Sequence, residues 1–169
     1  MGDEMGTDQS ALLQELLDKQ ALLELVTRYC RAVDRCDFDL LLSCYHPEAV
    51  DDHATFVGRP EDMFPPILER MRQLPPTQHI ISNATFEIRG DVALGEIYTG
   101  VRTSDTNGDY KHGGFGRSID RYERRDGEWR IAHRKVIIEW FDPGPGRERP
   151  AIDVSKKSRD DPSYNREWT

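Results

Sequence analysis

The sequence predicts an α+β protein, with helices in its first part and a β-meander after them. Two observations indicate this class. From Ser10 onward, apolar residues recur at three- and four-residue steps, as they do along the buried face of a helix. After Pro75-Pro76 the chain changes to four long β segments joined by turn-prone tripeptides. Because tight turns join consecutive strands antiparallel, we expect a curved sheet with the helices on one face.

Length and composition are those of one soluble domain. The chain has 169 residues, of which 37% are hydrophobic and 32% charged, and no apolar run is long enough to cross a bilayer. A formal net charge of −8 argues against nucleic acid as a partner, because phosphate binding requires clustered Lys and Arg. We therefore expect neither nucleic acid nor a membrane among its partners.

The expected localisation is cytoplasmic. The polar, acidic stretch Met1–Gln9 lacks the apolar core of a secretory signal. Cys30, Cys36 and Cys44 are odd in number, which indicates reduced cysteines rather than a disulfide framework. They also lack the paired spacing of a zinc site.

The first part of the chain predicts three helices. Residues 1–9 are expected to be a disordered tail, and a long helix spans residues 10–34. A short helix follows at about 38–44, and Pro47 marks its end, because proline disfavours helix in the residue before it. A short strand or hairpin at Ala49–Val57 then leads to the third helix.

The third helix begins at either Pro60 or Pro65-Pro66, since proline is favoured in a first turn, and it ends near Met71. Residues 143–169 are charged and open with Pro-Gly-Pro-Gly, so they are expected to form a C-terminal arm that is either a mobile tail or packed on a neighbouring subunit. The barrel domain is accordingly expected over residues 10–142. Its four long strands are expected at His79–Ile88, Val92–Thr103, Lys111–Arg124 and Trp129–Phe141.

Tyr29 and Asp34 flank the buried stripe of the long helix. Asp34 ends this helix, where the macrodipole disfavours a carboxylate by roughly several tenths of a kcal/mol, so its presence indicates a functional role. The alternative is a carboxylate that caps the next turn beside Arg31 or Arg35. Tyr29 also suits an ordinary core position, since a buried tyrosine needs one partner for its hydroxyl.

His79 begins an apolar strand and is a candidate general base, because imidazole accepts and returns a proton near neutral pH. A lone histidine at a strand end is often structural. A carboxylate from the facing helix changes that balance: Asp34 would hold one tautomer of the imidazole and stabilise its protonated form.

Strand alternation places Arg134 on an apolar side of the last strand, together with Ala132, Val136 and Ile138. A buried arginine requires an anion. Either Asp34 is that partner and the pair is structural, or Arg134 is free to bind a substrate's carbonyl, carboxylate or leaving group.

His112 shares one face of the preceding strand with Gly114 and Gly116. Two glycines on one face leave either a gap that suits a ligand or a bulge in the strand. Glu96 and Tyr98 on the neighbouring strand are further candidates for the cavity wall.

Metal and cofactor sites are not predicted. The cluster Asp51-Asp52-His53 matches no established metal spacing, and adjacent strand residues point in opposite directions. The sequence contains no phosphate-binding glycine loop, nucleophile elbow or catalytic cysteine signature.

These residues carry a family resemblance over about 12–141. The helix end from Tyr29 to Asp34, the strand start at His79 and the hairpin Tyr122–Trp129 followed by Arg134 resemble the SnoaL-like branch of the nuclear-transport-factor-two-like superfamily. The most similar group contains bile-acid 7-alpha-dehydratase, lindane dehydrochlorinase and scytalone dehydratase. The resemblance implies a cone-shaped α+β barrel, with a curved, mainly antiparallel sheet wrapped around three helices.

The resemblance also implies a cofactor-independent dehydratase that acts on a hydrophobic polycyclic or alicyclic hydroxy-ketone, a hydroxysteroid being favoured, and that forms a homotrimer or homodimer. An isomerase, a cyclase or a noncatalytic binding module of the same fold is the alternative. The expected catalytic residues are His79, Asp34 and Tyr29. The expected substrate-binding residues are Arg134, His112, Glu96 and Tyr98.

Overall fold

The computed structural model describes residues 2–53, 56–104, 110–142 and 156–166, with the side chains of 9–53, 56–104, 113–140 and 156–166. In these ranges, three α-helices stand beside one six-stranded sheet. The helices are α1 (Gly2–Asp34), α2 (Phe38–Ser43) and α3 (Pro60–Arg72). The strands are β1 (Tyr45–Asp52), β2 (Val57–Gly58), β3 (Thr77–Arg89), β4 (Val92–Ser104), β5 (Tyr110–Arg125) and β6 (Glu128–Asp142).

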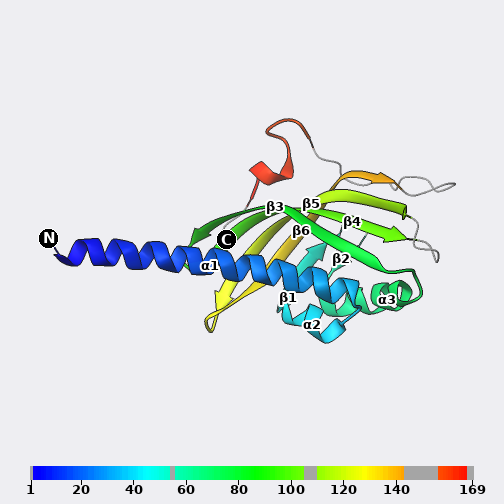
Figure 1. Cartoon of the computed structure of the whole chain (residues 1–169), viewed down its shortest axis with the longest axis horizontal. Helices are drawn as coiled ribbons and strands as arrows, with labels where there is room; N and C mark the ends of the chain where they lie inside the picture. Colours follow the sequence, from blue (N-terminus) through cyan, green and yellow to red (C-terminus); the bar gives the residue numbers. More distant parts are fainter. Residues whose placement is uncertain (1, 54–55, 105–109, 143–155, 167–169) are drawn as a thin grey trace.

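The sheet has the strand order β2-β1-β6-β5-β4-β3. Strands β3 to β6 pair antiparallel in sequence, as predicted, while β1 joins β6 in parallel. The β5–β6 turn has positive φ at Asp126 and Gly127, the backbone that a two-residue hairpin loop requires. The predicted α+β class with a curved, mainly antiparallel sheet around three helices is confirmed (Figure 1).

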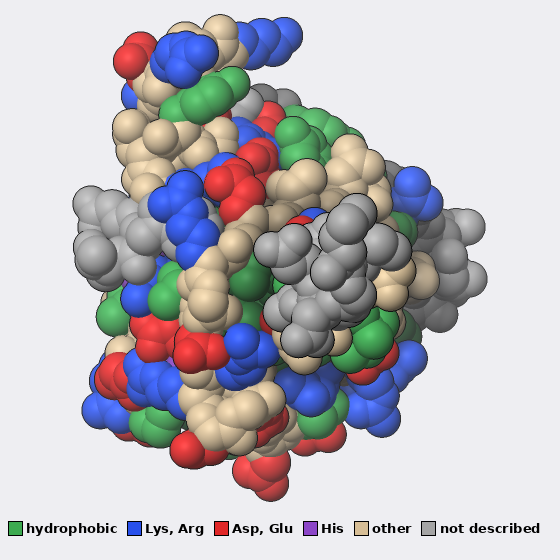
Figure 2. Space-filling view, turned by 90° about the vertical axis from the view of Figure 1, so that its left-hand side faces the viewer, with side chains coloured by type: hydrophobic (Ala, Val, Ile, Leu, Met, Phe, Trp, Pro, Cys, Tyr) green, Lys and Arg blue, Asp and Glu red, His purple; other side chains and the backbone are tan. Residues whose placement is uncertain are grey.

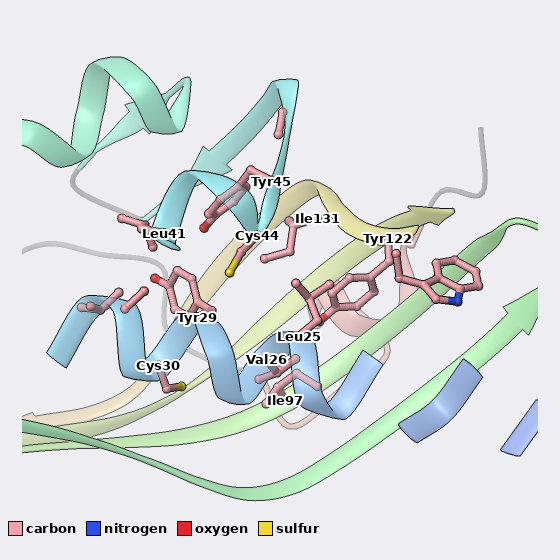
Figure 3. Close-up of a cluster of buried hydrophobic side chains, with 14 of the residues drawn as sticks. Leu25, Val26, Tyr29, Cys30, Leu41, Cys44, Tyr45, Ile97, Tyr122 and Ile131 are labelled. Atoms are coloured by element: carbon pink, nitrogen blue, oxygen red, sulfur yellow. The ribbon is translucent and has the colours of Figure 1, made fainter. Parts of the chain in front are cut away.

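The core lies between the C-terminal half of α1 and the concave face of the sheet. Leu22, Leu25 and Val26 on α1 pack against Ile97 and Tyr122, and all are nearly inaccessible to solvent (Figure 3). Helices α2 and α3 close one end of this core with Leu41, Phe64 and Leu68. Burial of a large apolar side chain contributes about 1.5–3 kcal/mol, so this layer holds α1 on the sheet.

Helix α1 begins at Gly2, earlier than the start near Ser10 that its apolar pattern indicated. Residues 2–9 contain no proline, and Asp3 and Glu4 lie at the helix N-terminus, where the macrodipole favours carboxylates. The N-terminal part of α1 projects beyond the sheet (Figure 1), and its leucines are more than half exposed. These are Leu12, Leu13, Leu16 and Leu17.

The structure decides between the two starts predicted for α3, Pro60 and Pro65-Pro66. Pro60 occupies its first turn, while Pro65 and Pro66 lie inside the helix. His46-Pro47, expected to mark the end of the second helix, lies in β1, just after α2 ends at Ser43. A proline is tolerated there because the residue pairing of β1 with β6 shifts between Tyr45 and Val50.

The convex face of the sheet is covered in part by the C-terminal segment 156–166 (Figure 1). Arg117 donates to Asp161 of this segment at 2.9 Å and to Glu96 and Glu139 at 2.5 Å each. Asp161 is 2% exposed. The segment therefore packs on its own barrel here, and the predicted contact with a neighbouring subunit stays a prediction.

Figure 2 shows the molecule from the side on which α1 begins. Acidic and basic side chains are interspersed on the surface seen there. Within the described ranges, no helix combines the length and apolarity needed to cross a membrane.

Candidate active site

His79 and Asp34 meet at the C-terminal end of α1. The Nδ1 atom of His79 lies 2.6 Å from the Asp34 Oδ1 atom, and the His79 backbone N–H donates to Oδ2 at 2.9 Å. The hydroxyl of Thr77 donates to the same carboxylate at 3.3 Å. The helix end and the first residues of β3 thus hold one carboxylate by three donors, which fixes the imidazole against it.

This geometry defines which nitrogen is available for chemistry. Burial raises the pKa of Asp34, but the hydrogen bonds from the His79 ring and backbone outweigh it, so the pKa lies below its ordinary value. An ionised Asp34 keeps the proton of neutral His79 on Nδ1, which leaves Nε2 as the acceptor. Among the described residues, Nε2 of His79 has no hydrogen-bond partner.

The concave face next to His79 is apolar and only partly covered. Register places Val101 opposite His79, with Thr99 and Ile138 on the same inward face. These three are partly exposed, whereas Ala93 and Ile97 further along β4 are fully buried. The interior is therefore filled at one end and accessible at the His79 end.

Tyr29, on the same helix as Asp34, lies in an aromatic cluster. Its ring meets Tyr45 edge-on at 6.1 Å and Phe64 at 6.5 Å, and the Arg134 guanidinium carbon lies 4.1 Å from its centroid. Burial raises the pKa of Tyr29 well above its ordinary value, although Arg134 opposes the shift. The hydroxyl thus stays protonated at neutral pH and is able to donate a hydrogen bond.

The partner of Arg134 is Asp120 and not Asp34, the partner that one of the two alternatives named. Arg134 donates from Nε and Nη2 to the two Asp120 oxygens at 2.9 and 2.7 Å. Tyr122 and Ser118 donate to the same carboxylate at 2.7 and 3.1 Å. Arg134 is 2% exposed, so it is also not a free anion site for substrate. Its guanidinium packs over the ring of Tyr29.

A bulge in β6 explains which face of the sheet the side chains of Arg134 and its neighbours point to. Arg121 pairs with His133 and Tyr122 with Ile131, so Ala132 is an extra residue. Ile131 and Arg134 consequently both face inward, which the strict alternation expected from the sequence excludes. Asp120, on the strand beside Arg134, was visible in the sequence only as one polar residue on a face with two glycines.

Glu96 and Tyr98 do not line the interior, contrary to the prediction. Ile97 between them is packed in the core, and successive strand residues point to opposite faces, so both lie on the convex side. Glu96 pairs with Arg117, whose guanidinium also lies over the ring of Tyr98 at 5.8 Å.

His112 contributes its backbone to β5 opposite Thr103, and its side chain lies outside the described residues. Gly116 marks a bulge rather than a ligand gap. A side chain at this position would place its Cβ 2.6 Å from the carbonyl oxygen of Ile137.

A second histidine–carboxylate pair lies on β1 and just after it, and sequence reasoning missed it. The Nδ1 atom of His53 lies 2.8 Å from Asp51 Oδ1, and Tyr45 donates its hydroxyl to Asp51 Oδ2. The spacing of two residues places both side chains on one face, and this spacing is the signal that the sequence offers for the pair. Asp52 points the other way and pairs with Lys135 at 2.8 Å.

Two of the three cysteines are excluded as competing nucleophiles, because burial keeps them protonated. Cys30, Cys36 and Cys44 are free thiols. Burial raises the pKa of Cys30 to about 11 and raises that of Cys44, so both thiols stay protonated at neutral pH.

Comparisons with solved structures show the nuclear-transport-factor-two-like class of fold. A putative scytalone dehydratase from Novosphingobium aromaticivorans DSM 12444 has 16% identity and a TM-score of 0.73, with 85% of this chain and 97% of that chain covered. A hexachlorocyclohexane dehydrochlorinase (LinA) type 2 has 19% identity and a TM-score of 0.65, covering 83% and 99%. An NTF2-like protein with a cystatin-like fold from Novosphingobium aromaticivorans has 19% identity and a TM-score of 0.70, covering 78% and 88%.

These identities are low, so the likeness establishes the fold and not the reaction. The sequence places the chain more closely: residues 14–135 match the family model of the SnoaL-like domain, and the chain belongs to this family. No curated protein matches the chain.

Proposed function

We propose that this protein is a cofactor-independent lyase, a dehydratase that eliminates water from a hydrophobic polycyclic or alicyclic hydroxy-ketone, with hydroxysteroids such as bile acids as the favoured class. The observation that carries the proposal is the 2.6 Å contact between His79 and Asp34, with the His79 Nε2 atom unpaired among the described residues, beside an apolar, accessible wall. The names of two structural neighbours, a dehydratase and a dehydrochlorinase, are those of elimination enzymes.

His79 would act as the base of the reaction. Its Nε2 removes a proton from the carbon next to the ketone, and the carboxylate of Asp34 stabilises the imidazolium that forms. The proton is acidic enough for imidazole only because the carbonyl delocalises the resulting charge, which is why a hydroxy-ketone is favoured over a simple alcohol.

Tyr29 would serve as the hydrogen-bond donor to the carbonyl oxygen. Its raised pKa keeps the hydroxyl protonated, and the Arg134 guanidinium 4.1 Å from the ring centroid favours negative charge developing on that side. Arg134, held by Asp120, is a positioning residue in this scheme and does not contact the substrate.

The test is turnover of a panel of hydroxylated keto-steroids and smaller alicyclic hydroxy-ketones, with products weighed by mass spectrometry. We predict that His79→Ala and Asp34→Asn each lower kcat/KM by about 10²- to 10⁴-fold, the usual contribution of a general base. His133→Ala is the matched control, because His133 is an exposed histidine on β6.

Folded His79→Ala and Asp34→Asn variants with near-native turnover would contradict the assignment. A product of unchanged mass would instead show isomerisation, in which His79 returns the proton to another carbon. A protein that binds these compounds without converting any of them would be a binding module of the same fold.

A further inference from the structure

His53 and Asp51 repeat the arrangement of His79 and Asp34 at a second position on the concave side. In both pairs the histidine presents Nδ1 to one carboxylate oxygen, at 2.8 Å for His53 and 2.6 Å for His79. In the described residues, Nε2 of His53 also has no hydrogen-bond partner. Resting on the proposed dehydration, we propose that His53 is the general acid that protonates the departing hydroxyl group.

Asp51 presents a fixed negative charge to His53. It is fully buried, and Tyr45 donates to the oxygen that His53 leaves unused, so both oxygens are occupied. Burial raises the pKa of Asp51, but His53 and the nearby charge of Arg134 outweigh it, and the carboxyl stays ionised. A buried carboxylate with one exposed imidazole partner stabilises that partner's positive charge.

The two histidines border the end of α1 from different sides. The sheet order puts β3, with His79, at one edge and β1 next to the other edge. Asp34 links α1 to β3, while the edge-on contact of Tyr29 with Tyr45 links α1 to β1. The ring of His53 lies edge-on to Phe64 at 6.3 Å, and Phe64 contacts Tyr29.

The solvent exposure of the two histidine side chains differs, as expected if His53 is the acid and His79 the base. The His53 side chain is 37% exposed and that of His79 is 14% exposed. A base in a covered, apolar place is protected from water. An acid at a more open place recovers its proton from solvent after each turnover.

The chemistry of elimination requires two such groups. As His79 takes the proton from carbon, the electron pair of that bond forms the new C=C bond, and the C–O bond breaks. Hydroxide is a poor leaving group, so the oxygen must receive a proton, here from Nε2 of His53, and departs as water. His79 ends protonated and His53 neutral, and exchange with solvent restores both.

A purely structural role for the pair is the competing explanation. The backbone N–H of His53 donates to the carbonyl of Phe56 at 2.7 Å, so Asp51 and His53 also tie the β1–β2 hairpin together. The two roles differ in one measurable respect. Only a general acid makes the rate depend on how much help the leaving group needs.

The experiment compares two probes that differ only in the leaving group, a β-hydroxy ketone and the corresponding β-chloro ketone. We expect His53→Gln to lower kcat/KM for the hydroxy ketone by about 10²-fold or more and to change the rate with the chloro ketone little, since chloride leaves without a proton. His79→Ala should slow both probes. His133→Gln is the matched control and His112→Gln the competing candidate, with folding of each variant checked by thermal unfolding.

Each outcome decides a different question. Equal losses on both probes for His53→Gln, or no loss on either, overturn the role of His53 while His79→Ala still tests the proposed function. A loss confined to the hydroxy ketone in His112→Gln, with His53→Gln unaffected, transfers the role to His112. If the wild-type protein eliminates neither water nor chloride, the proposed function fails and this inference fails with it.

Discussion

Arg134 is a charged residue with 2% of its surface exposed, and its neighbours explain how it is tolerated. Asp120 binds it through two hydrogen bonds, and Tyr29 covers the guanidinium at 4.1 Å. Removing one partner of a buried pair leaves an uncompensated charge, which costs more than the pair itself contributes.

We therefore predict that Arg134→Met lowers the free energy of unfolding by about 3–5 kcal/mol, measured by urea denaturation. The matched control is Arg130→Met on the same strand, whose ion pair with Glu128 at 2.6 Å is largely exposed and should contribute at most about 1 kcal/mol. Similar losses of unfolding free energy in the two variants would contradict this prediction, because they would show that burial of the Arg134–Asp120 pair does not increase its effect on stability.

At the scale of an element, the two bulges of β6 opposite β5 decide which side chains enter the interior. The pairing shifts between Phe115 and Gly116, where Gly116 packs against the backbone of Ile137. A backbone carbonyl gives way less easily than a side chain, so this glycine is required by close approach.

We predict that Gly116→Ala destabilises the protein by about 1–3 kcal/mol, because the added Cβ would lie 2.6 Å from the Ile137 oxygen. Gly58→Ala is the matched control, since a Cβ there meets nothing within 4 Å. Thermal or urea unfolding checks both. A neutral Gly116→Ala would mean that the two strands separate at the bulge with no cost.

At the scale of the whole molecule, Asp161 holds the C-terminal segment on the convex face of the sheet. It accepts from Arg117 and from the backbone N–H groups of Lys156 and Ser163. Burial raises the pKa of Asp161, but these donors lower it well below its ordinary value. The contribution of Asp161 to docking is therefore complete above the ordinary carboxyl pKa of about 4 and is lost as the pH falls through the lower folded value.

We predict that Asp161→Asn frees residues 156–166 at neutral pH, seen as faster amide hydrogen exchange in this segment, while the barrel keeps its stability. The barrel is spared because Arg117 retains Glu96 and Glu139. Asp160→Asn is the control, as Asp160 is exposed and accepts mainly from Ser158. Unchanged exchange in Asp161→Asn would assign the docking to other contacts, such as that of Arg166 with Glu87 at 2.6 Å.

The sequence by itself determined the class of fold, the order of the elements and the pairing of consecutive strands. It also placed His79 at a strand start and Asp34 at a helix end. These are local properties: helical spacing, turn residues and alternation act over a few neighbours along the chain, so they can be seen before folding.

Only the tertiary structure decided which charges pair. The pairing of Arg134 with Asp120 follows from the bulge in β6, and the parallel contact of β1 with β6 brings Asp51 and its partner His53 beside Arg134. Glu96 and Tyr98 lie on the convex side because Ile97 between them enters the core. The physical reason is that one extra residue in a strand reverses every later side chain, and that shift depends on how distant strands pack together.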